Sequence, residues 1–155
     1  MYLLSLLTTL LGSHAILSSA LTQSNCYGNP STVGYCTPLT YKDTTDDFSA
    51  PPTTIDCDST CIGINEDAGD WLVDFSTDAD GARHSMILYH CGFAVSRGES
   101  TSQDAKFSMA NQDMLDLYEE SLNRFGSLHN GSISAEGTMV CEDLEVNWYI
   151  QDLNA

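Results

Sequence analysis

Positive charge is scarce in this sequence. The chain of 155 residues has five Lys and Arg against 22 Asp and Glu, which gives a formal net charge of −17 at pH 7. Proteins that bind nucleic acids or anionic membrane surfaces use basic residues to neutralise phosphates, so we expect neither partner. The acidity is typical of a small protein that stays soluble and monomeric, and a cation-binding role is the less favoured alternative. The five bases are scattered along the chain: Lys42, Arg83, Arg97, Lys106 and Arg124.

Long apolar runs are absent beyond the first residues. A membrane-spanning helix needs about 20 apolar residues, whereas the run from Leu3 to Leu11 is shorter and ends in small residues up to Ala20. This pattern indicates a secretory signal peptide over residues 1–20. We therefore expect an N-terminal arm over residues 21–35 and one folded domain over residues 36–155, secreted to the extracellular space without a membrane anchor.

The motifs of common enzymes and metal sites are also missing. The chain has no G-x-S-x-G, no H-E-x-x-H, no phosphate-binding loop and no C-x-x-C spacing. His84, His90 and His129 have no spacing partner, so we expect structural or surface roles, with His90 of most interest because its strand looks buried. The segment 76–81 superficially resembles a calcium loop, but Ser76 occupies the first ligand position and Ile87 stands in place of the bidentate Glu, so a hairpin turn explains it better. We predict no enzymatic activity, no cofactor and no metal, and a small hydrolase or wall-binding protein is the least supported alternative.

What the sequence does have is an even number of cysteines beyond the leader. In a secreted chain this predicts three disulfides, although six cysteines permit 15 pairings and the sequence alone does not choose among them. A sequon at Asn130 predicts N-glycosylation at an exposed turn. The cysteines are Cys26, Cys36, Cys57, Cys61, Cys91 and Cys141.

Hydrophobic periodicity predicts two helices and five strands. The clearer helix begins at Asn111 as N-cap, ends at Gly126 and has one apolar face, and the other helix candidate spans residues 56–65. A turn at residues 78–81 predicts a hairpin between two of the strands, 71–75 and 86–95, and the second of these is apolar enough for the sheet centre. The fold class is therefore α+β, a small disulfide-stapled sandwich with two helices packed on an antiparallel sheet. The other expected strands are 35–42, 133–141 and 146–150.

A ferredoxin-like strand order would suggest one particular set of three disulfide bonds. The first strand would then lie antiparallel to the strand 133–141, which brings Cys36 near Cys141. The first helix would start above the central strand, so that Cys57 could reach Cys91. Cys26 would then pin the N-terminal arm to Cys61.

A set of spaced residues carries a family resemblance. It includes Cys91-x-Phe93-x-Val95 in one strand and Val146-x-Trp148 in another. Together these residues resemble the fungal extracellular-protein-two effector family, also called the putative necrosis-inducing factor domain, over roughly Cys36 to Ile150. His90 and Gly92 depart from the residues usual in the family, and Cys26 and Cys61 are additional to its four cysteines. The other matching positions are Asp56-Cys57, Trp71, Asp113, Leu117 and Ala135-x-Gly137-x-Met139-x-Cys141.

The resemblance implies a secreted fungal effector without enzymatic activity. Such a protein would bind a plant host protein and induce necrosis or immune recognition. Some relatives are domains of larger chitinase-like proteins with killer-toxin character. The alternative function is therefore a killer-toxin-like antimicrobial protein that acts on competing microbes.

Overall fold

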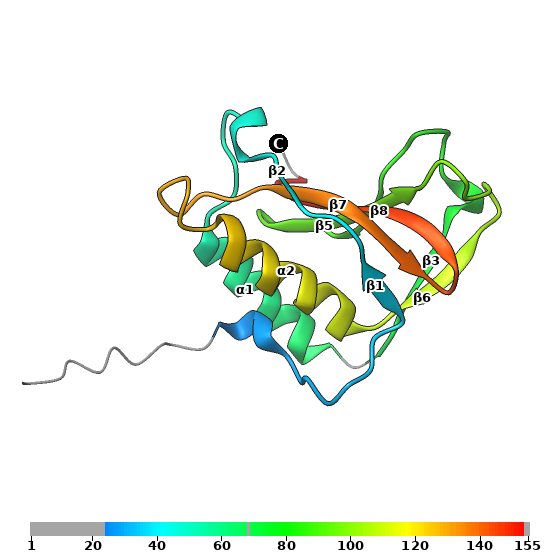
Figure 1. Ribbon diagram of the computed structural model, residues 1–155, viewed down its shortest axis with the longest axis horizontal. Helices are drawn as coiled ribbons and strands as arrows, with labels where there is room; N and C mark the ends of the chain where they lie inside the picture. Colours follow the sequence, from blue (N-terminus) through cyan, green and yellow to red (C-terminus); the bar gives the residue numbers. More distant parts are fainter. Residues whose placement is uncertain (1–23, 68, 154–155) are drawn as a thin grey trace, which may run out of the picture.

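The computed structural model describes residues 24–67 and 69–153. In that part of the chain two α-helices, α1 (Thr54–Glu66) and α2 (Asn111–Phe125), lie side by side on one side of an antiparallel sheet (Figure 1). This is the predicted α+β architecture. The expected signal peptide, residues 1–20, lies outside the described residues. Residues 24–67 and 69–153 also contain three short 3₁₀ helices: η1 (Asn25–Tyr27), η2 (Thr45–Asp47) and η3 (Phe75–Thr77).

The strands form a six-stranded main sheet and a separate two-stranded ribbon. The main sheet consists of β1 (Cys36–Pro38), β2 (Lys42–Asp43), β4 (His84–Ile87), β5 (Gly92–Arg97), β7 (Ala135–Cys141) and β8 (Leu144–Gln151), and the ribbon of β3 (Trp71–Asp74) and β6 (Lys106–Met109). Strand β8 is central, with β5 and then β4 on one side and β7 on the other. Both β1 and β2 pair with β7, and every pairing is antiparallel.

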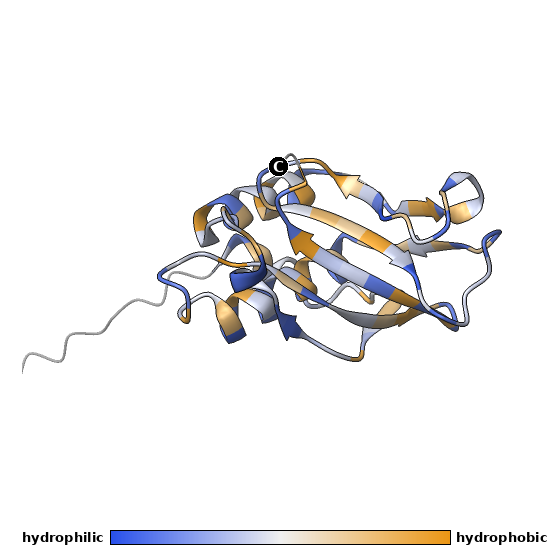
Figure 2. Cartoon of the chain, turned by 90° about the horizontal axis from the view of Figure 1, so that it is seen from above, coloured by the Kyte–Doolittle hydropathy of each residue, from blue (hydrophilic) through white to orange (hydrophobic). Residues whose placement is uncertain are grey.

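The core lies between the helices and the sheet. Along β8, Val146, Trp148 and Ile150 are buried and alternate with more accessible residues, as a period of two predicts. Figure 2 shows hydrophobic and hydrophilic residues alternating along strands of the sheet. The expected apolar arc of α2 is confirmed, because Leu122 and Phe125 pack against the core and four of its residues are buried: Met114, Leu115, Leu117 and Tyr118.

The start of α2 differs from the prediction by one residue. Ala110 is the N-cap and Asn111 is the first helical residue. The Asp113 carboxylate accepts hydrogen bonds from the backbone N–H groups of Ala110 (2.8 Å), Cys36 (3.0 Å) and Tyr35 (3.1 Å). Asp113 therefore caps α2 and ties the beginning of β1 to it, which leaves the Asn111 side chain for another role.

Three disulfides connect elements of the fold: Cys26–Cys61, Cys36–Cys141 and Cys57–Cys91. These pairings match those expected from the sequence. The reason for the second pair is also as expected, because β1 pairs antiparallel with β7 and places Cys36 opposite Cys141. The first pair fastens η1 to α1, so the N-terminal arm is held against the two helices.

The predicted hairpin between residues 71–75 and 86–95 is wrong. Strand β3 pairs with β6, a strand that we did not expect, and places Val73 opposite Phe107. Strand β4 pairs instead with β5. The alternation of Trp71, Val73 and Phe75 indicates a half-buried strand but does not specify its partner. Strand β6 has the same alternation, because Phe107 and Met109 are buried and the residues between and before them are more accessible.

The predicted strand 86–95 is two strands joined by a turn. Strand β4 ends at Ile87 and β5 begins at Gly92, so residues 88–91 cross from one to the other. The His90 side chain is 78% exposed, which corrects the expectation of a buried strand around it. Likewise, the expected strand 35–42 consists of β1 and β2, which pair with separate parts of β7.

Candidate functional site

The three histidines in the described part of the chain contact different carboxylates. His84 Nδ1 lies 2.9 Å from Asp78 Oδ2, and His90 Nδ1 lies 3.4 Å from Asp152 Oδ2. The structure therefore does not bring the histidines together into one site. Among residues 24–67 and 69–153, no group of three or more His, Cys, Asp or Glu side chains is arranged to hold a metal ion.

His129 is held between two carboxylates. Its Nε2 lies 2.7 Å from Asp43 Oδ2 and its Nδ1 lies 3.2 Å from Asp46 Oδ1. The hydrogen bond to Asp43 is the main reason why the pKa of His129 is raised above 6.5. For Asp43, burial acts to raise the pKa, but hydrogen bonds from Thr45 and His129 outweigh it and the pKa is lowered. This arrangement holds the end of β2 to the turn before β7.

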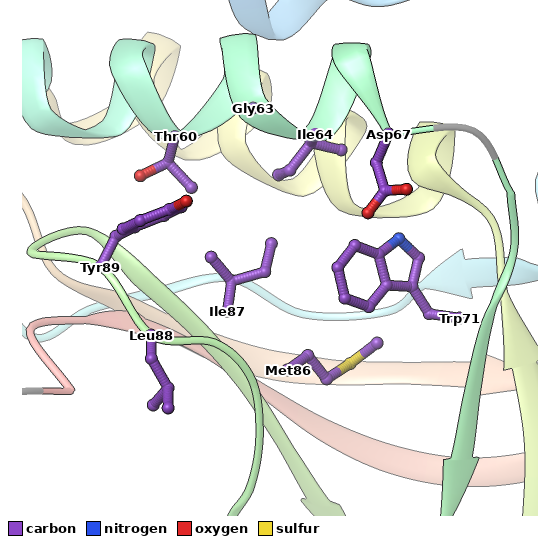
Figure 3. A pocket seen from close by; sticks show the side chains of 9 residues that line it. All are labelled: Thr60, Gly63, Ile64, Asp67, Trp71, Met86, Ile87, Leu88 and Tyr89. Carbon is purple, nitrogen blue, oxygen red and sulfur yellow. The ribbon is translucent and has the colours of Figure 1, made fainter.

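The candidate binding site is a hollow between α1 and the turn 88–91 (Figure 3). Its volume is about 350 Å³, which falls within the range of ~300–1,000 Å³ for ligand pockets. Figure 3 shows the Asp67 carboxylate beside the Trp71 indole at one end and the Tyr89 ring at the other. The lining residues are Thr60, Gly63, Ile64, Asp67, Trp71, Met86, Ile87, Leu88 and Tyr89.

A second hollow of about 230 Å³ continues the first along α1. It shares Thr60, Gly63 and Tyr89 with the first hollow. Its other lining residues are Asp56, Ser59 and His90. Because Asp56, Thr60, Gly63 and Asp67 recur at helical spacing, the two hollows follow one face of α1. We call them together the α1 groove.

The wall opposite α1 is fixed by bonds to Cys91. The Cys57–Cys91 disulfide joins the helix to the end of the turn 88–91. The Thr60 hydroxyl donates to the Cys91 carbonyl oxygen at 3.0 Å, and the buried Tyr118 hydroxyl donates to the same oxygen at 2.9 Å. Burial raises the pKa of Tyr118, so its hydroxyl stays protonated and remains a donor. The α1 groove is therefore held in shape before any ligand binds.

The Trp71 end of the groove is fixed by Asn111. The Trp71 Nε1–H donates to Asn111 Oδ1 at 2.6 Å. The Asn111 Nδ2 donates to the carbonyl oxygens of Ile64 and Asp67, both at 2.8 Å, at the C-terminal end of α1. The Asn111 side chain, which we expected to cap α2, thus donates hydrogen bonds to carbonyl oxygens at the end of α1 and orients the Trp71 indole.

Gly63 keeps the middle of the groove open. A Cβ at this position would have Tyr89 Cε2 as its neighbour, at 3.9 Å, which is an ordinary contact. Glycine in the interior of a helix is less stable than alanine by about 1 kcal/mol, and here no crowding requires it. The space above Gly63 belongs to the groove.

Sequence reasoning found the groove residues only in part. Trp71 was expected in a strand, and it is half-buried at the start of β3, where it lines the groove. Tyr89 is 60% exposed and was placed inside a central strand. The signal in the sequence for a turn at residues 88–91 was Gly92, because a glycine after His90 and Cys91 is compatible with a strand that begins just after a turn.

The predicted glycosylation site directly follows His129, in the turn that contacts the start of α1. Asn130 is exposed and has a positive φ of 54° in the turn before β7. This position is accessible to a modifying enzyme, and its glycosylation stays a prediction.

The comparisons with known proteins concern most of the folded region. No curated protein matches the chain. Residues 35–141 match a protein family described as "pathogen effector; putative necrosis-inducing factor". The match begins one residue before Cys36, ends at Cys141 and includes α1, α2 and both walls of the α1 groove. The chain therefore belongs to this family of pathogen effectors.

Proposed function

We propose that this protein is a secreted fungal effector without enzymatic activity, which binds a plant host protein and so induces necrosis or immune recognition. The observation that carries the proposal is the family match over residues 35–141. Binding by a folded surface needs no catalytic group, and a preformed groove is a suitable surface for it.

Three features support secretion. Disulfides persist in oxidising compartments, and all six cysteines are paired in the structure. The family consists of pathogen effectors, which is consistent with a secreted protein. The first 20 residues have the pattern of a secretory leader. No helix in the described part of the chain is long and apolar enough to cross a membrane.

The proposal is tested by infiltrating the purified, oxidised protein into leaves of a panel of plant species. We expect cell death or an immune response in some hosts and none in others. The control is the same preparation after reduction and alkylation, which should be inactive because the response depends on the fold. If no host responds and no host protein is captured by the oxidised form, the proposal is wrong.

The absence of catalysis is tested separately. The protein should release no product from chitin, glucan or pectin under conditions in which it elicits the leaf response. Turnover of any of these polymers would replace the binding proposal with an enzymatic one.

A further inference from the structure

We infer that the α1 groove binds a basic segment of a partner protein, with a large apolar side chain in the hollow and a Lys or Arg on either side of it. This inference rests on the proposed function and names the chemistry of the partner. It is argued from the charge, the shape and the spacing of the groove.

The charge at the two ends of the groove is negative. Asp67 lies at the Trp71 end and Asp56 at the other end. Hydrogen bonds from Thr53 lower the pKa of Asp56, so this carboxylate stays ionised in mildly acidic fluid. Among the lining residues, His90 is the one basic side chain; it lies 3.4 Å from Asp152 Oδ2, and it also contributes to the lowered pKa of Asp56.

The protein's own strong bases do not neutralise the groove. No Lys or Arg lines either hollow. Four of the five pair with carboxylates elsewhere, and Arg83 lies over the Tyr149 ring, 3.8 Å from its centroid. The carboxylate pairs are Lys42–Glu136, Arg97–Asp80, Lys106–Asp74 and Arg124–Glu120. Apart from His90, which lies near enough to Asp56 to lower its pKa, positive charge opposite Asp56 and Asp67 would therefore come from the partner.

The middle of the groove is apolar. Its buried floor is formed by Ile64 and Ile87, and the half-buried Met86 and Trp71 lie beside them (Figure 3). An apolar side chain that enters between Trp71 and Tyr89 would leave water and contact two aromatic rings, the kind of pocket in which interface hot spots lie. Gly63 leaves room for it.

The spacing of the two carboxylates limits the partner segment. Asp56 and Asp67 are eleven residues apart along α1 and its C-cap, which corresponds to roughly 16 Å at ~1.5 Å per residue. An extended peptide spans that distance in about five residues at ~3.3 Å each. A helical partner would need about eleven residues. A second copy of this chain is a poor occupant because it carries the same net charge of −17.

The first test is a selection of phage-displayed random 16-residue peptides on the oxidised protein. We expect enriched peptides to carry two basic residues, about five or about eleven positions apart, with a large apolar residue between them. Enrichment of acidic or uncharged peptides, or no enrichment, would overturn the inference.

The second test measures the affinity of one enriched synthetic peptide for variants of the protein. Asp67→Asn should weaken binding about three- to fivefold, as expected for one exposed ion pair. Tyr89→Ala should weaken binding at least about tenfold, as expected for an aromatic wall of the pocket. Asp47→Asn and Tyr27→Ala are matched controls, because both residues are exposed and line neither hollow. Equal binding by the groove variants and the controls would overturn the inference.

The leaf assay separates this inference from the proposed function. If the folded groove variants elicit the same response as the wild-type protein, the groove inference fails while the effector function stands. If the wild-type protein elicits nothing and captures no host protein, the function fails, and the peptide selection still decides what the groove binds.

Discussion

Asp113 joins three parts of the structure through one side chain. It accepts backbone hydrogen bonds from Ala110, Tyr35 and Cys36, and so connects α2 to the chain that enters β1. Burial raises the pKa of Asp113, while these three donors act in the opposite direction. A Cβ at Gly34 would collide with the Asp113 carboxylate, so a glycine is required at that close approach.

We predict that Asp113→Asn lowers the free energy of unfolding by about 2 kcal/mol, because an amide nitrogen replaces an acceptor and leaves at least one buried N–H unsatisfied. Urea unfolding measures the change. Asp116→Asn is the control, since Asp116 is exposed on the same helix and an amide oxygen can still accept from Gln112. Equal stability of the two variants would contradict the capping role of Asp113.

The pair of His129 with Asp43 gives a prediction about pH at the same scale. The pKa of His129 is raised above 6.5, so its stabilising contribution is full below pH 6.5 and is lost as the pH rises through the higher folded pKa. The pKa of Asp43 is lowered below 3.8, so its contribution is full above that pH and is lost on further acidification. The pair therefore stabilises the protein most between about pH 4 and 6.5.

Thermal unfolding measured against pH checks this prediction. The melting temperature of the wild-type protein should fall as the pH rises above 6.5, and His129→Asn should reduce that fall. His90→Asn serves as the control because the His90 side chain is 78% exposed. A wild-type profile that His129→Asn leaves unchanged in slope would show that this pair does not couple to folding.

At the scale of elements, Gly63 makes α1 less stable but keeps the groove open. We predict that Gly63→Ala raises the free energy of unfolding by about 0.5–1 kcal/mol, since the helix gains the better residue and the added methyl group meets only Tyr89, at 3.9 Å. Urea unfolding tests this. The same variant should bind the selected basic peptide more weakly, because the methyl group occupies the groove. A variant that is both more stable and an unimpaired binder would show that the groove does not need this glycine.

The elements also show how far the sequence predicts the fold. The periodicity of α2 and the alternation of Val146, Trp148 and Ile150 are local patterns, and both predictions hold. The pairing of β3 with β6 is not local, and alternation alone allows several partners. The run 86–95 was predicted as one strand because it is apolar on both faces apart from His90, whereas the chain turns at residues 88–91 and exposes Tyr89.

The α1 groove also could not be predicted from the sequence, because it too depends on contacts between residues that are far apart in the chain. It forms where α1 meets a turn about 30 residues later, and its shape depends on contacts with Asn111 and Tyr118 in a third element. Each of these residues had a simpler local interpretation. Asn111 was expected as a helix cap, and Tyr118 lies on the one apolar face expected of the same helix.

At the scale of the whole molecule, two of the disulfides close loops of nearly equal length. Cys26 and Cys61 are separated by 35 residues and Cys57 and Cys91 by 34. On the loop-entropy account, each should stabilise the fold by about 4 kcal/mol. All four cysteines are fully buried, so replacing either pair by alanine leaves comparable cavities. The two bonds differ in position, because only Cys57–Cys91 holds the turn 88–91 against α1.

We therefore predict that the two double variants lose similar stability but differ in binding. Removal of Cys26–Cys61 frees the N-terminal arm and leaves the walls of the α1 groove in place, so a protein that remains folded should bind the selected peptide about as tightly as the wild type. Removal of Cys57–Cys91 loosens the wall that carries Tyr89, because only the hydrogen bonds of Thr60 and Tyr118 to Cys91 then hold it, and the peptide should bind at least about tenfold more weakly. Urea unfolding and peptide titration under conditions in which both variants are folded make the comparison. Because the expected stability losses are matched, a binding loss specific to the second variant is caused by the geometry of the groove, and equal losses would place the binding surface elsewhere.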